Sequence, residues 1–431
     1  MKAAPSNQTG SPSSHSFKDR LRQAVKQHVS VTPKPEVASV EGVDANSGAA
    51  LEAILGGCWV ETEHGKTLVV DEEYPLDHVH GKRPLSNFLR LSSGAFRCLI
   101  PSNVDVSPER FGFFDIETTG LSGGTGTYCF LAALGMFTER SFRVRQYFLA
   151  DLLQERAQLT LLTEDLKRCG IVVTYNGRCF DVPCIDTRML LARFGSPFDH
   201  AYSLDILYPV RRLYRHRLES CRLGETEQRL AGFLRKDDVP GWMAPTLYFD
   251  YLRAKRIAPM SGVLRHNRDD ILSTLGVLTH LAELFADTEP SPDDAVALAR
   301  WWEMSGSVER ARQLYADALP SLEGQEAWRW AAARHAGLCK RAGERGEAAR
   351  LWGRLWAAGD RHAGLELAKH FEHWKRDLPQ AEEVTQRLLD DSPETDTAAL
   401  QHRLLRIQRK LIRKRDTASA KNKATREKRG D

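Results

Sequence analysis

The chain has 431 residues, 42% of them hydrophobic and 27% charged, with a formal net charge of +4 at pH 7. This length predicts two or three domains, and the composition is that of a globular protein with a sizeable core. No apolar run approaches the ~20 residues that span a bilayer. The eight cysteines contain no CxxC pair, which favours reduced thiols in a cytoplasmic protein.

The first 107 residues fall into two segments of different composition, residues 1–50 and residues 51–107. Residues 1–50 are rich in Ser, Pro, Gly and Ala and lack the apolar core of a signal peptide, so we expect a disordered leader and no secretion. Residues 51–107 hold short alternating runs, such as CWVETEHG and KTLVV, between glycine-bearing turns. This pattern predicts a β-rich preface that packs on the next domain.

Two acidic residues end an apolar run in FGFFDIETTG, residues 111–120. The three phenylalanines predict a buried strand, and Asp115 and Glu117 follow where it should end. Because side chains alternate between the faces of a strand, the two carboxylates should project together. Their repulsion would be relieved by a divalent cation that prefers oxygen ligands, Mg²⁺ or Mn²⁺. The alternative is a strand end with two solvated acids.

Two later segments carry residues of the same kind. In IVVTYNGRCFDVP, a β-branched run and an Asn-Gly turn precede Asp181. In VLRHNRDDILSTLGVL, apolar residues recur at helical spacing, and His266 and Asp270 are four apart on one helix face. Four carboxylates and a histidine suit two-metal phosphodiester hydrolysis, with two cations about 3.5–4 Å apart and the histidine as the base toward water.

An arginine-rich segment, DILYPVRRLYRHRLESCR, interleaves arginines with tyrosines between these two motifs. Arginines neutralise phosphates, and aromatic rings stack on unpaired bases. The alternative is a solvated helix face with ordinary intrahelical ion pairs. Beside a site that handles phosphodiesters, we interpret the segment as the part that grips the strand. The expected substrate-binding residues are Asn176, Arg211, Arg212, Tyr214 and Arg215.

Residues 287–402 are alanine-rich and helical in pattern after the linker-like stretch TEPSPDD. A set of small and aromatic residues recurs there at an offset of 37: Gly306, Ala311, Leu314 and Tyr315 match Gly343, Ala348, Leu351 and Trp352, with a weaker third copy at Ala381 and Val384. This period predicts a tetratricopeptide-like array that presents a concave surface to a protein partner. A plain helical bundle is the alternative.

The tail is basic. Residues 403–431 contain 12 Lys or Arg against 3 Asp or Glu, a balance of +9, so the rest of the chain carries −5. Such a run suits non-specific, salt-sensitive attraction to nucleic acid. The alternative is a solvated, disordered terminus.

DIETTG, YNGRCFD and HNRDD, in that order, resemble the three motifs of the DEDD exonuclease superfamily, which has the ribonuclease H-like fold. The blocks TTGLSGGTGTYCFLAALG, DILYPVRRLYRHRLESCRLGETEQRL and DVPGWMAPTLYFDYLR narrow the resemblance to the YprB family, over roughly residues 51–284. By motif position, the resemblance makes His266 the general base and assigns the metal-binding acids to Asp115, Glu117, Asp181 and Asp270.

One departure from the superfamily concerns the spacing of the histidine. His266 lies four residues before Asp270, the spacing of the tyrosine branch, whereas the histidine branch uses five. A histidine four residues before the last aspartate is the pattern that we expect in the YprB group. It leaves Asp269 open as an alternative last ligand, and it leaves open a role for His266 in positioning the helix only.

The predicted fold is an α/β ribonuclease H-like domain, a mixed sheet with flanking helices in residues 108–286, followed by the all-α tetratricopeptide-like region. The predicted function is a cytoplasmic nuclease that uses two Mg²⁺ or Mn²⁺ ions to hydrolyse single-stranded DNA or RNA. Its 3′–5′ exonuclease polarity rests only on the resemblance. A non-catalytic nucleic-acid-binding scaffold and a structure-specific endonuclease stay open, although a pure binder has no need for four converging carboxylates.

Overall fold

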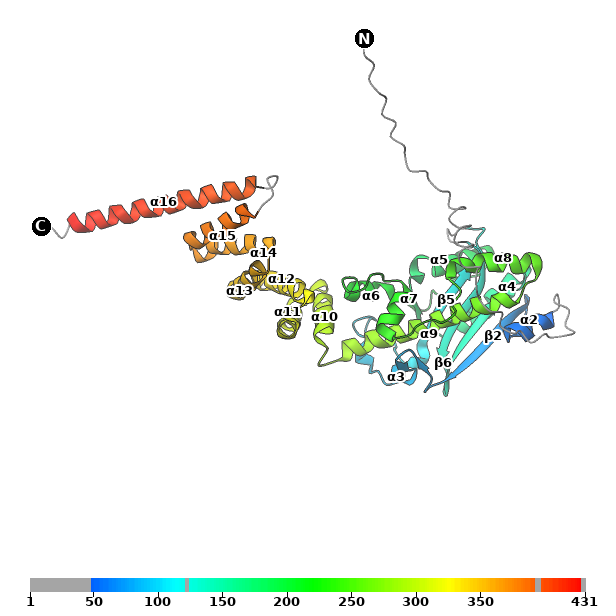
Figure 1. The fold of residues 1–431 in the computed structure, drawn as a ribbon. Helices are drawn as coiled ribbons and strands as arrows, with labels where there is room; N and C mark the ends of the chain where they lie inside the picture. The colour runs from blue at the N-terminus through cyan, green and yellow to red at the C-terminus, as the bar shows by residue number, and fades with distance from the viewer. Residues whose placement is uncertain (1–47, 121–123, 392–396, 428–431) are drawn as a thin grey trace, which may run out of the picture. The chain divides into compact units, whose positions relative to one another are not determined.

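The chain is described by a computed structural model that covers residues 48–120, 124–391 and 397–427 (Figure 1). Residues 1–47 of the expected leader lie outside these ranges. The strands are β1 (Cys58–Thr62), β2 (Gly65–Pro75), β3 (Val79–His80), β4 (Arg83–Pro84), β5 (Phe111–Thr118), β6 (Cys129–Phe137), β7 (Ser141–Phe148), β8 (Ile171–Thr174) and β9 (Tyr202–Asp205).

The α-helices before the helical region are α2 (Gly48–Leu55), α3 (Ser86–Leu89), α4 (Glu155–Leu166), α5 (Asp181–Leu191), α6 (Leu207–Tyr214), α7 (Leu223–Thr226), α8 (Ala244–Ala254) and α9 (Ala258–Ala286). The later helices are α10 (Pro292–Met304), α11 (Val308–Ala318), α12 (Glu326–Arg341), α13 (Arg345–Ala357), α14 (Arg361–His370), α15 (Leu378–Asp390) and α16 (Ala398–Glu427).

Seven strands form one sheet in the order β1-β2-β7-β6-β5-β8-β9, and β3 pairs with β4 separately. The pairs from β1 to β5 are antiparallel, whereas β5, β8 and β9 run parallel. The sheet is therefore mixed, as predicted. Because β2 pairs with β7 from Leu68 to Pro75, strands β1 and β2 of the expected β-rich preface extend this sheet instead of covering it.

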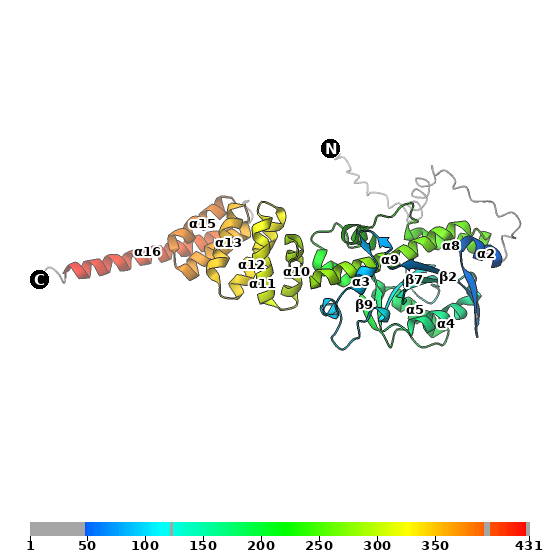
Figure 2. The same ribbon diagram turned by 90° about the horizontal axis from the view of Figure 1, so that it is seen from below.

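Helices cover both faces of the sheet. The strands lie between α9 on one side and α4 and α5 on the other (Figure 2). Alternation along β5 assigns its side chains to these layers: Phe111 and Phe113 pack in the core with α9, whereas Phe114 and Ile116 pack with α4 and α5. Asp115 follows Phe113 by two residues and therefore faces α9.

A glycine on β6 lets α9 come close to the sheet. A Cβ atom at Gly135 would overlap Cγ2 of Ile271 on α9 and lie 2.6 Å from Cζ of Phe142. Both neighbours are buried in the core and have no room to shift. The missing side chain thus fixes the height of α9 above the sheet, directly after its HNRDD motif.

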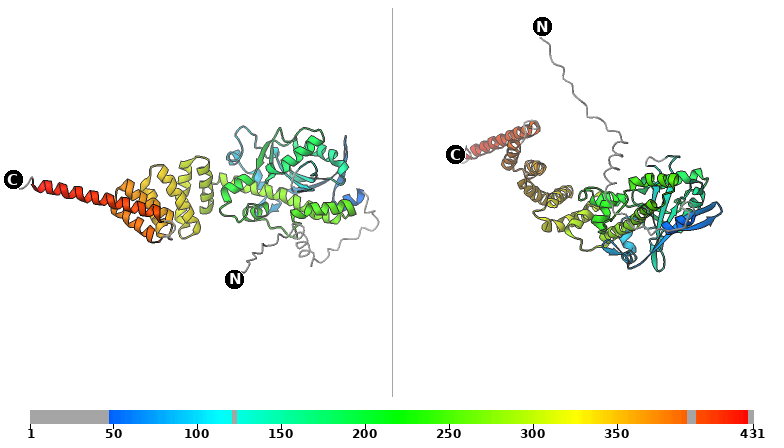
Figure 3. Two further views of the ribbon diagram at one scale, coloured as in Figure 1. Left: turned by 90° about the horizontal axis from the view of Figure 1, so that it is seen from above. Right: turned by 45° about the vertical axis from the view of Figure 1, so that its right-hand side comes forward.

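After α9 the chain continues as consecutive helices from α10 to α16, coloured yellow-green to red in Figure 3. The turns before α11, α13 and α15 each contain one residue with positive φ, five positions before a fully buried alanine: Gly306 and Ala311, Gly343 and Ala348, Arg376 and Ala381. The predicted helical region is confirmed, and its tetratricopeptide-like class stays a prediction. None of the described helices is long and apolar enough to cross a membrane.

The last helix, α16, is held by one buried acid. The side chain of Glu372 is 0% exposed and accepts hydrogen bonds of 2.6–2.9 Å from Arg403, Arg406 and Lys410 of α16. Ile407 lies on the same face of α16 and is buried against α15. The first part of the predicted basic tail is therefore helical, with one face packed on the preceding helices.

We expect Glu372→Gln to destabilise this packing in a pH-dependent way. Burial disfavours ionisation of Glu372, but hydrogen bonds from Arg406 and Lys410 outweigh it and lower its pKa to about 2. A lowered pKa stabilises the fold above the unfolded value of about 4.3, and this contribution disappears as the pH falls toward 2. The variant should lose about 2 kcal/mol of unfolding free energy at pH 7 and less at about pH 3.

Urea unfolding followed by circular dichroism at both pH values measures this difference. Glu382→Gln is the matched control, because Glu382 accepts a hydrogen bond of 3.0 Å from the uncharged Gln408 of α16. A pH-independent difference for Glu372→Gln would contradict the account.

Candidate active site

The acids of β5 lie beneath α9. Asp115 and Glu117 project from the strand toward α9, on the face opposite Phe114 and Ile116. Asp115 accepts a hydrogen bond of 2.7 Å from the side-chain amide of Asn267, and the Asn267 oxygen accepts one of 2.9 Å from Gln146 on β7. Strand β5, helix α9 and β7, the next strand but one, therefore fix the Asp115 carboxylate together.

Asp181 begins α5 after a tight turn. Asn176 adopts a left-handed conformation, with φ of 69°, and its N–H donates to Asp205 at 2.8 Å. A Cβ atom at Gly177 would lie 2.7 Å from Oδ2 of Asp181, so only glycine permits this approach. Asp205 also accepts the N–H groups of Arg178 and Leu207, which gives it a structural part in the turn.

These carboxylates affect one another electrostatically. Burial first, and then the negative charges of Asp270, Asp181 and Glu117, raise the pKa of Asp115 well above its usual range. Burial and the charges of Asp270 and Asp181 do the same to the pKa of Glu117. Burial, Asp205 and Asp270 raise the pKa of Asp181 to about 8. Four acids from one strand, β5, and two helices, α5 and α9, thus share one low-dielectric region.

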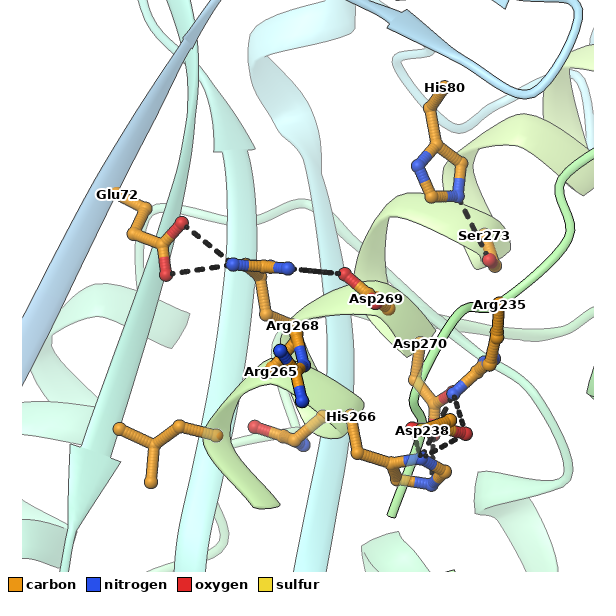
Figure 4. A network of polar contacts seen from close by, with 12 residues as sticks. Glu72, His80, Arg235, Asp238, Arg265, His266, Arg268, Asp269, Asp270 and Ser273 are labelled. Atoms are coloured by element: carbon orange, nitrogen blue, oxygen red, sulfur yellow. Dashed lines mark hydrogen bonds and ion pairs between the residues drawn. The ribbon is translucent and has the colours of Figure 1, made fainter. Parts of the chain in front are cut away.

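Arg235 is the cation at this site. Its side chain is 13% exposed and donates two hydrogen bonds, of 2.7 and 2.9 Å, to Glu227, which is 2% exposed. The same guanidinium pairs with Asp270 and approaches Asp238 at 3.5 Å (Figure 4). It is also the charge that lowers the pKa of Glu117, against the acids that raise it.

His266 presents its two ring nitrogens to different groups. Nδ1 lies 2.9 and 3.0 Å from the two oxygens of Asp238 and 3.0 Å from Arg235, whereas Nε2 faces Asp270 at 3.6 Å and Glu117 at 3.9 Å. Asp238 only accepts hydrogen bonds, so its two contacts favour a proton on Nδ1, against the single contact from Arg235, which can only donate. That tautomer leaves the lone pair of Nε2 on the side of the acids.

Asp269 points away from this group. Its carboxylate accepts hydrogen bonds of 2.9 and 3.0 Å from Arg268, which also reaches Glu72 of β2 (Figure 4). Asp270, one residue later, lies beside His266 and Arg235. Between the two alternatives for the last acid, this geometry favours Asp270, and we keep Asp270 in the proposed site.

A pocket of about 620 Å³ opens beside the acids. Asp115 and Asp270 line it together with Asn176, Arg211 and Arg215. The rest of the wall comes from the following residues: Tyr175, Leu207, Leu218, Glu219, Ser220, Cys221, Arg222 and Leu223. Basic side chains and apolar surface thus adjoin the carboxylates in one cavity.

Two of the expected substrate-binding residues lie elsewhere. Arg212 donates hydrogen bonds of 2.9 Å to the carbonyl of Trp301 and 2.6 Å to the hydroxyl of Ser305, both on or at the end of α10. Tyr214 is buried, and its hydroxyl is 2.8 Å from Nε2 of His280. Arg212, one position after Arg211, points about 100° away around the helix, and Tyr214 is buried in the core, so the proposed site leaves out Arg212 and Tyr214 and keeps Arg211 and Arg215.

The donor set has the chemistry of a divalent-cation site, because buried, mutually repelling carboxylates gain from a cation with oxygen preference. In residues 48–120, 124–391 and 397–427, however, no three His, Cys, Asp or Glu side chains are grouped so that they could hold a metal ion. The pairing of Asp270 with Arg235 accounts for part of this, since the guanidinium holds that carboxylate.

Sequence comparison with known proteins decides the family. The family described as RNase_H superfamily matches residues 112–282. Protein YprB of Bacillus subtilis (strain 168) is 32% identical over 363 residues, which are 80% of this chain and 86% of that protein. The chain belongs to the YprB-type ribonuclease H-like family. This membership confirms the predicted ribonuclease H-like fold class, which is a nuclease-type fold.

One solved structure is also similar. The family B DNA polymerase from the hyperthermophilic archaeon Pyrobaculum calidifontis matches 60% of this YprB-type chain with a TM-score of 0.35 and 16% sequence identity. The match spans about a third of the polymerase chain, 34%.

Sequence reasoning on the YprB-type chain missed Glu227, Arg235 and Asp238. All three lie between the second and third motifs, and no periodicity or short motif distinguishes them from other charged residues there. A signal existed nonetheless, because Glu227 and Asp238 fall inside the quoted blocks LGETEQRL and DVPGWMAP. The missing information was that this segment folds back onto α9.

We expect Arg235→Met to destabilise the fold by about 3–5 kcal/mol, because Glu227 would stay buried without its partner. The double variant Arg235→Met/Glu227→Gln removes that charge and should recover much of the loss. Urea unfolding measures both. Arg229→Met, which removes an exposed pair with Glu225, is the control and should change stability by less than about 1 kcal/mol. Wild-type stability of Arg235→Met would refute the role of Arg235.

Proposed function

We propose that this protein is a metal-dependent nuclease and acts as a 3′–5′ exonuclease on single-stranded nucleic acid. The observation that carries the proposal is the composition of one pocket, in which Asp115 and Asp270 adjoin Arg211 and Arg215. Carboxylates suit the ions that activate phosphodiester hydrolysis, and arginines suit the phosphates of the strand. The family supports a nuclease-type fold, and the direction from the 3′ end rests on the resemblance of the three motifs to the DEDD exonucleases.

Each residue of the site has a proposed part. Asp115, Glu117, Asp181 and Asp270 would hold two Mg²⁺ or Mn²⁺ ions, which supply charge stabilisation for the attacking and leaving oxygens. His266 accepts a proton from water at Nε2, and Asp238 holds the proton on Nδ1. Arg211 and Arg215 bind backbone phosphates, and Asn176 lies at the pocket wall beside the turn to Asp181.

Asp115→Asn should abolish hydrolysis and leave the fold intact. The asparagine keeps an oxygen for Asn267 and removes one of several repelling charges, so the free energy of unfolding should not fall. The assay is degradation of 5′-labelled single-stranded RNA and DNA with Mg²⁺, with Mn²⁺ and with EDTA. A metal-dependent ladder is expected for the wild type.

The control for this experiment is Asp199→Asn, which changes an exposed carboxylate. Cleavage by Asp115→Asn at the wild-type rate would overturn the site. Internal cleavage of a substrate blocked at its 3′ end would show an endonuclease, and binding without cleavage by the wild type would show a scaffold.

Asp238→Asn should lower kcat by about 10- to 100-fold with little change in KM, the size of effect found when the partner that orients a functional histidine is lost. The asparagine amide can donate to Nδ1 and so favour the tautomer in which Nε2 carries the proton. Steady-state kinetics separates the two constants. Asp237→Asn is the matched neighbour with an exposed side chain and should keep wild-type kcat. Equal kcat in the two variants would remove Asp238 from the mechanism.

A further inference from the structure

The exposed surface of α16 carries basic residues that have no acidic partner among the described residues. Glu372 engages Arg403, Arg406 and Lys410 on the inner face. The next basic residues along the helix are exposed: Arg409, Arg413, Lys414 and Arg415. Among the residues that the structure describes, no carboxylate forms an ion pair with any of these four.

The charge of the helix is large and of one sign. From residue 398 to residue 427 the sequence contains 10 Lys or Arg and 2 Asp or Glu, a balance of 10 − 2 = +8. A single buried acid holds the helix in place, so docking neutralises little of this charge. The helical conformation of α16 spaces Arg409 and Arg413 one turn apart on the outer side.

We propose that the exposed basic surface of α16, which Arg409, Arg413, Lys414 and Arg415 form on more than one side of the helix, is a second nucleic-acid-binding surface, separate from the pocket of the ribonuclease H-like domain. The surface binds the phosphate backbone without reading sequence. The choice of nucleic acid as the occupant rests on the proposed function, because a second contact with the same polymer raises the effective concentration of the strand at the protein.

The other occupants fit this face less well. A helix that lies on a membrane needs a continuous apolar face, and here Arg409 separates Leu405 and Ile412, which are 54% and 58% exposed. A second copy of α16 would bring like charges together. A polyanion meets neither objection, since each exposed arginine or lysine gains a phosphate and releases counterions.

The test is the salt dependence of binding. A variant with Arg409→Gln, Arg413→Gln, Lys414→Gln and Arg415→Gln keeps good helix formers at all four positions. Binding of labelled single-stranded DNA and RNA is measured by fluorescence anisotropy in EDTA over a series of salt concentrations. Each phosphate contact with a single strand contributes about 0.7 to the slope of log K against log salt, so the slope should fall by about 2–3.

The matched control neutralises four exposed basic residues elsewhere, Arg90→Gln, Arg97→Gln, Arg140→Gln and Lys167→Gln. Its slope should stay near that of the wild type. Equal slopes for the α16 variant and the wild type would overturn the proposal, and so would equal losses in both variants, which would indicate net charge alone. Loss of binding to phosphatidylserine vesicles without loss of oligonucleotide binding would also overturn it and assign the face to membranes.

The experiment separates this inference from the proposed function. Because it is run in EDTA, it does not depend on hydrolysis. A protein that never cleaves but shows the reduced slope retains the α16 surface and loses the nuclease assignment. A protein that cleaves but shows an unchanged slope retains the nuclease assignment and loses the α16 surface.

Discussion

The repulsion among buried carboxylates is the constraint on which the candidate active site depends. Asp115, Glu117 and Asp181 are placed where burial and one another's charges oppose ionisation. If only stability mattered, apolar residues of similar volume at these positions would serve as well or better. The structure instead supplies one internal cation, Arg235, and fixes it with a dedicated buried acid, Glu227. The carboxylates are thus held in a state that is unfavourable without positive charge.

Two small features of the sheet allow this arrangement. Alternation along β5 sends Asp115 and Glu117 to the side of α9, and the absence of a side chain at Gly135 lets α9 come down onto that side. Asn267 can then reach Asp115, and Gln146 orients Asn267 from the next strand but one. The distance between the helix and the strand, rather than any single contact, determines whether His266 and Asp270 meet the acids.

The sequence predicted the parts of the site that follow from local periodicity. The face of β5, the pairing of His266 with Asp270 on one helix side and the mixed sheet with its helical region all rest on patterns of two or four residues. The partners Arg235, Asp238 and Glu227 come from an irregular segment, whose path depends on long-range packing that no local period encodes. The division of the chain into domains stays a prediction, since Ala297, Leu298 and Trp301 of α10 share the core that contains α9.

The geometry of helix α6 explains why only some of the arginines that the sequence predicted at the pocket line it. A helix turns by about 100° per residue, so Arg211 and Arg215 face the pocket while Arg212 faces α10. Arg212 also stacks its guanidinium 4.3 Å from the centre of the Trp301 ring, and Arg217 bonds Asp294 at 3.1 Å. This short helix and its C-terminal cap therefore carry the pocket-lining arginines on one side and the contact with α10 on the other. Because α6 has only eight residues, the two sides cannot shift independently, and the position of Arg211 and Arg215 depends on the packing of α10.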